Sequence, residues 1–558
     1  MNQWEQLTGE ARLVLRCCLL QYGSQWMPET APRRLLQGRL SGVEVVLACR
    51  ELLRTGWMKS MHKGWGEVRY AVPERYMGQL LQWMLHPPEF AGELSGCRMV
   101  AEASGRVTGQ LLHLMAGMYP KGLQLTLKGA LHKKAQQLLN ERSPFALVDG
   151  MDAIHSESAA ALDSYSVVFE LLVYLGMLRL EERRYAIDEA VLNGWLARSN
   201  EERLVILYDW LTAHHRPDGV AAELLASLLQ LQSSSAGRWI NVSAMLAWLQ
   251  AHRAAGAVED SFPDEAWNWL LQLSRLDLGD AAVSDEGTLL FRWSIPVAGL
   301  PPAEQARAGE QSEKQIYVQP DMDILVPLST DHRIRWLLEI WTERVSHDRM
   351  SVYRLSAQRF TSAVAHSSPE SFLLMLKRTA ASGIPEHVQL LLEQWCREWP
   401  SSVSPGDTFG QEGRGPSLAS VSEPLGPEIP SRKSLEPSAL PAEEMLFAGL
   451  QQVPLRWTQM DGAYHPSTAR KLVEQAVQWE TKLALSIAGE SRIYIPAKVE
   501  DGAPWSVSGW FVSAPTAEDS WPPPSLCSLS PDDWNGMRIV VPPPEVWIHS
   551  SSDGRDML

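Results

Sequence analysis

Cysteine is scarce in this chain, and its spacing argues against sites that depend on paired thiols. The 558 residues include six cysteines and no C-x-x-C pair, which disfavours zinc ribbons and thioredoxin-type redox sites. Cys17 and Cys18 lie in the apolar stretch ARLVLRCCLL. We therefore expect them to be small core residues rather than a thiol sensor.

The sequence also lacks the common catalytic motifs. It contains no G-x-x-x-x-G-K-[ST] phosphate loop, no H-E-x-x-H zinc motif and no G-x-S-x-G nucleophile elbow. The tetrapeptides DEAV (188–191) and DEAW (264–267) superficially resemble the acidic box of helicases. Neither follows a convincing apolar strand, and the phosphate loop that such a box must adjoin is missing. We therefore predict a protein that is not an enzyme, with no cofactor and no metal.

Long apolar runs are missing as well. No stretch of about 18 uninterrupted apolar residues occurs, which predicts no transmembrane helix and no membrane partner. The beginning, MNQWEQLTGEARLV, lacks the basic and apolar regions of a secretory signal, so we expect a cytoplasmic protein. The net charge of −16 disfavours non-specific DNA binding by the chain as a whole, but it leaves room for a basic face on one domain.

The residues that are present predict an α+β protein, mostly helical, that begins with a winged-helix-like domain over residues 1–85. Helices are expected at 9–23 and 41–54, and the second ends before Gly56. Strands in WMKSM and EVRYAV then enclose a turn at 62–66. The apolar side of the second helix is expected to contain Val43, Val46, Leu47 and Leu53.

Basic residues gather on this predicted helix and wing. In a DNA-binding winged helix they would contact phosphates, and in the alternative interpretation they are solvated charges around a protein-interaction module. The candidate nucleic-acid-binding residues here are Arg50, Arg54, Lys59 and Lys63.

Residues 86–305 are predicted to form a helical block with further winged-helix-like units. A strand around Leu123, Leu125 and Leu127 should lead into a helix after Gly129. Helix-plus-hairpin patterns recur at 166–188 and 264–294 without a strict sequence period. The basic cluster that follows the first strand is a second candidate for nucleic-acid contact, although short clusters of this kind are usually solvated helix starts; it contains Lys128, Lys133 and Lys134.

A compact domain is predicted over residues 314–400. It opens with IYVQPDMDILVP, continues with an amphipathic helix after Asp331, and ends in IPEHVQLLLEQWCREW. The helix is expected to bury one apolar stripe, which continues to Val345. A second strand runs from Arg349 to Leu355, and a further helix is expected to begin at Ser368-Pro369.

The order and spacing of these segments resemble the N-terminal domain of XPB-type DNA helicases, which also occurs in bacterial helicase-associated proteins without a motor. The resemblance implies association with DNA transactions, with a helicase or nuclease subunit as one expected partner, and implies nothing about ATP hydrolysis. Arg349 and Arg354 are further candidates for phosphate or acidic-partner contact. The favoured alternative is that they form structural ion pairs.

The last part of the chain divides into three segments. Residues 401–443 are rich in Ser, Pro and Gly and predict a flexible linker, and residues 546–558 predict a frayed tail. Between them, residues 444–545 show a helix at about 467–479 followed by strands. This order resembles WYL-type domains, which implies a small Sm-like β-barrel, but Trp505-Ser506-Val507 stands in place of the Trp-Tyr-Leu signature.

Three functions are consistent with these patterns. The first is a non-catalytic protein that binds DNA or a DNA-processing partner in repair or transcription. The second is a protein-interaction scaffold without DNA binding, which the acidic net charge favours. The third, a ligand-sensing transcription regulator, depends on the WYL-like segment alone.

Overall fold

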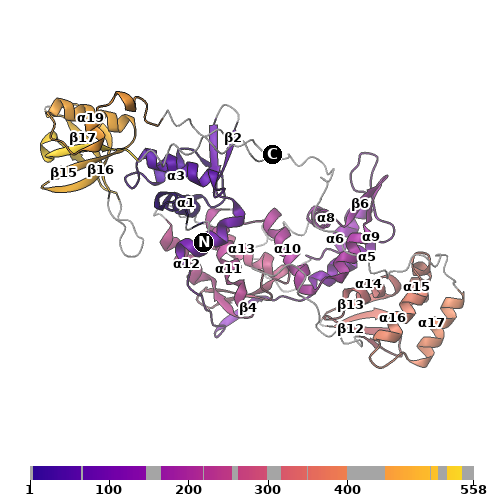
Figure 1. The fold of residues 1–558 in the computed structure, drawn as a ribbon. Helices are drawn as coiled ribbons and strands as arrows, with labels where there is room; N and C mark the ends of the chain where they lie inside the picture. Colours follow the sequence, from indigo (N-terminus) through magenta and orange to yellow (C-terminus); the bar gives the residue numbers. More distant parts are fainter. Residues whose placement is uncertain are drawn as a thin grey trace. The chain divides into compact units, whose positions relative to one another are not determined.

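Helices and small antiparallel sheets alternate along the chain, as expected of an α+β protein (Figure 1). The computed structural model describes residues 4, 6–63, 67–145, 165–217, 219–253, 262–297, 316–348, 350–398, 446–502, 504–512 and 524–542, without the side chains of 63, 262 and 263. Two compact units are formed: Met1–Pro87, Leu249–Val258 and Leu425–Leu558 make up unit 1, and Pro88–Trp248 and Glu259–Pro424 make up unit 2. Within the described residues, none of the helices has the length and apolar character needed to cross a membrane.

The N-terminal part of unit 1 has the element order helix, strand, helix, helix, strand, strand. Its three strands pair in the order β1-β3-β2, so the first strand lies beside the last. A capping box starts α3, where Ser41 N donates to Glu44 Oε2 (2.9 Å) and Glu44 N donates to Ser41 Oγ (3.4 Å). The elements are α1 (Gly9–Tyr22), β1 (Met27–Pro28), α2 (Ala31–Leu35), α3 (Gly42–Arg54), β2 (Lys59–Lys63), β3 (Glu67–Ala71), a 3-10 turn (Glu74–Tyr76) and α4 (Met77–Leu85).

The same element order recurs twice in the described residues after α4. In the second copy the strands pair as β5-β7-β6, and in the third as β8-β10-β9 with β4 added beside β9. The last helix and the hairpin of each later copy were predicted, at 166–188 and 264–294; the preceding elements of the copies were not. The second copy contains α5 (Val107–Met118), β5 (Leu123–Gln124), α6 (Lys133–Glu141), α8 (Tyr165–Tyr174), β6 (Leu178–Glu181) and β7 (Arg184–Ile187). The third contains α11 (Val220–Leu231), β8 (Trp239–Asn241), α12 (Val242–His252), α13 (Phe262–Arg275), β9 (Gly279–Ser284) and β10 (Leu289–Trp293), with β4 at Cys97–Ala101.

Between the second and third copies lie α9 (Glu189–Ala197) and α10 (Asn200–His214). Both helices begin at side-chain caps, Asp188 for α9 and Ser199 for α10. Trp195 and Trp210 are fully buried, so both side chains belong to the core of this part of the chain.

The region from Ile316 to Glu398 in unit 2 is a four-stranded antiparallel sheet with helices packed against it (Figure 1). We call it the central module. Its core includes Trp341, which stacks on Phe372 with ring centroids 5.3 Å apart. The strands pair in the order β11-β12-β14-β13. The elements are β11 (Tyr317–Val318), β12 (Asp323–Pro327), α14 (His332–Trp341), β13 (Glu343–His347), β14 (Met350–Arg354), α15 (Ala357–Val364), α16 (Pro369–Thr379) and α17 (Glu386–Glu398).

The C-terminal part of unit 1 is a five-stranded antiparallel sheet with α19 lying against it (Figure 1). We call it the C-terminal domain. The predicted helix followed by strands is confirmed. Its elements are a 3-10 turn (Leu450–Gln452), α18 (Arg456–Gln459), α19 (Pro466–Gln478), β15 (Lys482–Ile487), β16 (Glu490–Glu500), β17 (Ser506–Phe511), β18 (Leu526–Leu529) and β19 (Gly536–Val540).

Three local predictions were wrong. Among the described strands the C-terminal sheet runs β18-β17-β16-β15-β19 with both end strands unpaired on one side, so it is not a closed barrel. Val345 lies in β13 and is 50% exposed, because α14 stops at Trp341. The strand at Leu123 is two residues long, since Thr126 to Gly129 form a turn that leaves Leu127 exposed.

The apolar side of α3 was also assigned incorrectly. The residues that α3 buries in its own part of unit 1 are Val45, Ala48, Cys49 and Leu52. Val43 and Leu47 instead pack on the C-terminal domain, so α3 has two apolar sides. Cys18 is fully buried as expected, while Cys17 is half-buried.

Candidate functional site

The predicted basic residues of the first copy lie on α3 and on the strand that follows it. Arg50 and Arg54 are one helical turn apart on α3; Arg54 is exposed and Arg50 is half-buried. Lys59 is exposed at the start of β2, and its ammonium lies 5.1 Å from the centroid of the Trp26 ring. Lys63 ends β2, and its side chain falls outside the described residues, as does the turn at 64–66.

The sign of the charge separates this part from the rest of the chain. Residues 1–87 contain eleven Lys and Arg and seven Asp and Glu, a net charge of +4. Because the whole chain carries −16, the remaining residues carry −20. The net charge of the N-terminal part is therefore opposite in sign to that of the whole chain. Attraction to phosphates depends on such local charge.

The second basic group belongs to the second copy, in unit 2. Lys128 lies in the turn after β5, and Lys133 and Lys134 are the first two residues of α6. All three are exposed, and the side chain of His132 caps the helix by accepting from Lys134 N at 3.5 Å. Because this group and the basic residues of α3 lie in different units, each must be judged by itself.

Of the two candidate arginines of the central module, Arg354 lies within the described residues and Arg349 does not. Arg354 lies opposite Asp323 in the β12–β14 register, and its Nε is 2.8 Å from Asp323 Oδ1. Arg359, nearby, donates to the backbone oxygen of Glu339 at 2.8 Å. These contacts support the structural interpretation of Arg354.

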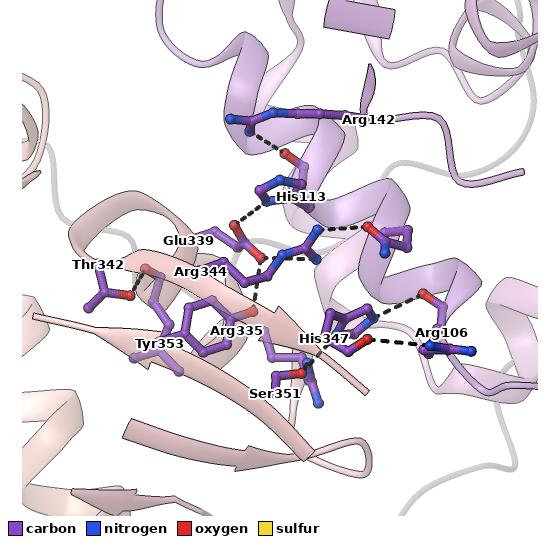
Figure 2. Close-up of polar contacts among 12 residues, drawn as sticks. Arg106, His113, Arg142, Arg335, Glu339, Thr342, Arg344, His347, Ser351 and Tyr353 are labelled. Carbon is purple, nitrogen blue, oxygen red and sulfur yellow. Dashed lines mark hydrogen bonds and ion pairs between the residues drawn. The ribbon is translucent and has the colours of Figure 1, made fainter. Parts of the chain in front are cut away.

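A buried polar network that was not predicted joins α5 to the central module (Figure 2). Its hub is Glu339 on α14, whose side chain is 3% exposed. Tyr353 Oη donates to Glu339 Oε1 at 2.9 Å, and His113 Nδ1 lies 2.7 Å from Glu339 Oε2. Arg344 NH1 lies 3.7 Å from Glu339 Oε1, and its NH2 donates to Gln110 at 2.7 Å. Each carboxylate oxygen therefore has a partner.

A second branch of the network lies around His347 (Figure 2). His347 Nδ1 lies 2.8 Å from Ser351 Oγ, and Nε2 lies 3.4 Å from the backbone oxygen of Arg106. Arg335 donates to Ser351 Oγ at 3.2 Å and to the backbone oxygen of Pro327. On the α10 side, Arg203 NH1 lies 2.9 Å from His332 Nδ1. The network thus crosses from the helical block into the module at several points.

Burial and arginine charges keep the histidines of this network neutral. Burial, followed by repulsion from Arg203 and Arg335, lowers the pKa of His332 to about 3. Burial and the charges of Arg344 and Arg335 lower the pKa of His347 to about 4. Burial also lowers the pKa of His113, against the opposing effect of Glu339. Neutral His113 can therefore donate Nδ1–H to the Glu339 carboxylate.

Glu339 stays ionised in spite of its position. Burial is the largest single influence and raises the pKa of Glu339, but His113, Arg344 and Tyr353 together bring it below its ordinary value. A buried, ionised carboxylate that two donors hold by hydrogen bonds, with an arginine as ion-pair partner, is suited to fixing two parts of a fold together.

The polar network could have been suspected from α14 alone. His332, Arg335 and Glu339 recur at helical spacing on one side of this helix, and they are buried with Trp336. The pattern was missed because charged residues usually face solvent, so these side chains were not expected to be buried. Within the described residues, no group of three or more His, Cys, Asp or Glu side chains is placed to hold a metal ion.

Comparison with family models and with curated protein sequences found no match for this chain.

Proposed function

We propose that the chain is a non-catalytic DNA-binding protein, and that the N-terminal part of unit 1 makes the contact. The proposal is supported by the element order of this part and by its β1-β3-β2 sheet, which match the order expected for a winged-helix domain. Helices α2 and α3 then correspond to a helix-turn-helix, in which the second helix enters the major groove. The β2–β3 hairpin corresponds to the wing, which would lie along the phosphate backbone.

The observation that carries this proposal is the concentration of positive charge. Residues 1–87 combine this topology with a basic excess, at +4 against −20 for the rest of the chain. In α3 and β2 the exposed Arg54 and Lys59 follow one another along the chain. Neutralising phosphates with such side chains supplies most non-specific affinity. The resemblance of residues 314–400 to a helicase-associated domain, given above from the sequence, also favours a role in DNA transactions.

The proposal is tested by measuring binding of the full chain to a fluorescent DNA duplex at several salt concentrations. The double variant Arg54→Glu/Lys59→Glu should bind more weakly and show a shallower dependence on salt. The logarithmic slope should fall by roughly 0.9 for each phosphate that the variant no longer neutralises. A matched control is Lys377→Glu/Arg378→Glu, which makes the same charge change at exposed positions of α16.

The expected result is a loss of affinity in the first variant that the control does not share. Equal losses in both variants would show that only total charge matters. If neither the wild-type chain nor any variant binds duplex DNA at low salt, the proposal is wrong.

A second candidate, a protein-interaction scaffold, is favoured by the other two copies. The helix that corresponds to α3 is α8 in the second copy, where Glu170 is the only charged residue, and α13 in the third, whose first turn contains Asp264 and Glu265. Val173 and Tyr174 at the end of α8 are 42% and 41% exposed. Acidic or apolar helices suit protein contacts better than phosphate contacts.

The scaffold is tested by purifying the chain from its native cell after nuclease treatment and asking which proteins remain bound. A Val173→Ser/Tyr174→Ser variant should lose such a partner while its DNA binding is unchanged. Retention of the partner by this variant would remove α8 as the docking helix.

A further inference from the structure

We propose that the C-terminal domain covers the N-terminal end of α3 and competes with DNA for it, so that the described structure is a closed state. The inference rests on the proposed function, because it concerns the same helix. In a helix-turn-helix the residues at the N-terminal end of the second helix contact base edges. In this chain the residues that surround that end belong to the C-terminal domain.

Glu480, which follows α19, makes the central contact. Its carboxylate pairs with Arg33 of α2 at 2.5 Å, and its backbone oxygen accepts from Val43 N at 3.2 Å. A Cβ on Gly42, the first residue of α3, would overlap Glu480 Oε2. A carboxylate therefore sits at the positive end of the α3 dipole and beside an arginine, where a DNA phosphate would otherwise bind.

The contact is apolar as well as ionic. Val43 is 2% exposed and belongs to the hydrophobic core of the C-terminal domain, together with Leu483, Leu485 and Trp479. Leu47, one turn further along α3, packs against the same cluster. Burial of these apolar side chains favours the covered state over one in which they face water. DNA cannot lie against these residues while the domain remains in place.

Two further contacts fix the orientation of the domain. Lys482 Nζ lies 2.5 Å from Glu44 Oε1, and both side chains are largely buried, at 15% and 19% exposure. In the turn between α2 and α3, a Cβ on Gly38 would lie 2.6 Å from Cβ of Pro524 and 2.9 Å from Trp510. The turn and the start of α3 are thus covered together.

The backbone of Glu480 indicates that its side chain matters. Glu480 has φ +51° directly after the end of α19, a left-handed position that glycine occupies most easily. A glutamate is strained in this conformation, and the carboxylate that it provides is the one that meets Arg33 and α3. The net charges of the two parts are also opposite in sign. Residues 444–545 contain twelve acidic and seven basic residues, a net charge of −5, whereas residues 1–87 carry +4.

The test is the affinity of the full chain for a DNA duplex when the contact is loosened. Glu480→Gly removes the carboxylate and suits the left-handed backbone, so the C-terminal domain should fold normally. Lys482→Glu places a like charge beside Glu44. Each variant should bind DNA about tenfold more tightly than the wild-type chain, because apparent affinity rises with the fraction of molecules that are open.

Matched controls separate opening of the contact from a change in total charge. Glu490→Gln removes one acidic charge, and Lys498→Glu reverses one basic charge, at exposed positions of β16. Both should leave the affinity within about twofold of the wild-type value. The Lys482→Glu variant is the sharper test, because total charge alone predicts weaker DNA binding where opening predicts stronger binding.

The outcomes are distinguishable. If wild type and both loosened variants bind DNA equally well, the competition is wrong and the proposed DNA binding stands. If the loosened variants gain affinity only as much as Glu490→Gln does, charge rather than opening is responsible, and the inference is again wrong. If neither the wild-type nor the loosened chains bind at low salt, the inference and the proposed function fail together.

Discussion

Tyr353 donates its hydroxyl hydrogen to Glu339 Oε1 over 2.9 Å, and both side chains are almost completely buried. The other oxygen of Glu339 is held by His113, which belongs to a different part of unit 2. One carboxylate therefore ties the strand β14 and the helix α5 to the helix α14. This relationship makes Glu339 the residue whose replacement should reveal most about the stability of unit 2.

Glu339→Ala should lower the free energy of unfolding of unit 2 by about 3–5 kcal/mol, because it leaves buried donors without their acceptor. Urea denaturation of the full chain measures this loss. Glu339→Gln keeps an acceptor oxygen and should cost less. The control is Glu343→Ala in β13, at an exposed position, and it should change stability by less than about 0.5 kcal/mol.

Tyr353→Phe should cost about 1.5–3 kcal/mol, the usual range for a hydrogen bond to a charged group. The phenyl ring stays in place, so the loss reports the hydroxyl alone. Tyr317→Phe, at a ring that is 43% exposed, is the matched control. A Tyr353→Phe protein as stable as wild type would show that His113 and Arg344 suffice to hold the carboxylate.

Stability should fall as the pH is lowered from 7 to 5. The pKa of buried His332 is about 3 in the folded chain and about 6.5 in an unfolded one, so only the unfolded chain takes up this proton in that range. The stabilisation is complete above about pH 6.5 and is lost as the pH falls toward 3. The loss from His332 alone is roughly 2 kcal/mol at pH 5.

Thermal denaturation at a series of pH values measures this dependence. His332→Gln keeps an acceptor for Arg203 but does not titrate, so it should flatten the profile. His366→Gln, at an exposed position, should leave the profile unchanged. If stability falls equally steeply with pH in the wild-type chain, His332→Gln and His366→Gln, a group other than His332 causes the acid sensitivity.

Two glycines should respond to alanine in opposite directions. At Gly279 in β9, a Cβ would overlap Phe291 Cζ and would lie 2.5 Å from the backbone oxygen of Arg292. Gly279→Ala should therefore destabilise unit 2 by about 1–3 kcal/mol. At Gly194 in α9 a Cβ meets nothing within 4 Å, so Gly194→Ala should stabilise the helix by up to about 1 kcal/mol. Denaturation midpoints of the two variants provide the comparison.

The helices and hairpins were predictable because interactions between residues close in sequence determine where they begin and end. Ser41 with Glu44 starts α3, Asp331 caps α14, and Gly287 at φ +82° turns between β9 and β10. Such interactions span a few positions and depend little on the rest of the chain. The start of α16 at Pro369 was also predicted, although Ser368 makes no capping hydrogen bond there.

The contacts that join parts of the chain could not be predicted in the same way. Val43 and Leu47 were assigned to the same apolar side as Leu53, because nothing near them in sequence indicates a second partner. That partner lies more than 400 residues further along, as the Glu44–Lys482 separation of 438 positions shows. A structural ion pair was the favoured interpretation of Arg354, but its partner could not be named, because only the register of β12 and β14 places Asp323 opposite it.

The long separation between α3 and the C-terminal domain has a consequence for synthesis of the protein. A ribosome adding about 5–20 residues per second needs roughly 20–90 s to travel from Glu44 to Lys482. The N-terminal part can fold as soon as it emerges, and throughout that interval Val43 and Leu47 face water without their cover. Every newly made molecule therefore passes through a period with α3 uncovered, during which these apolar side chains expose it most to aggregation.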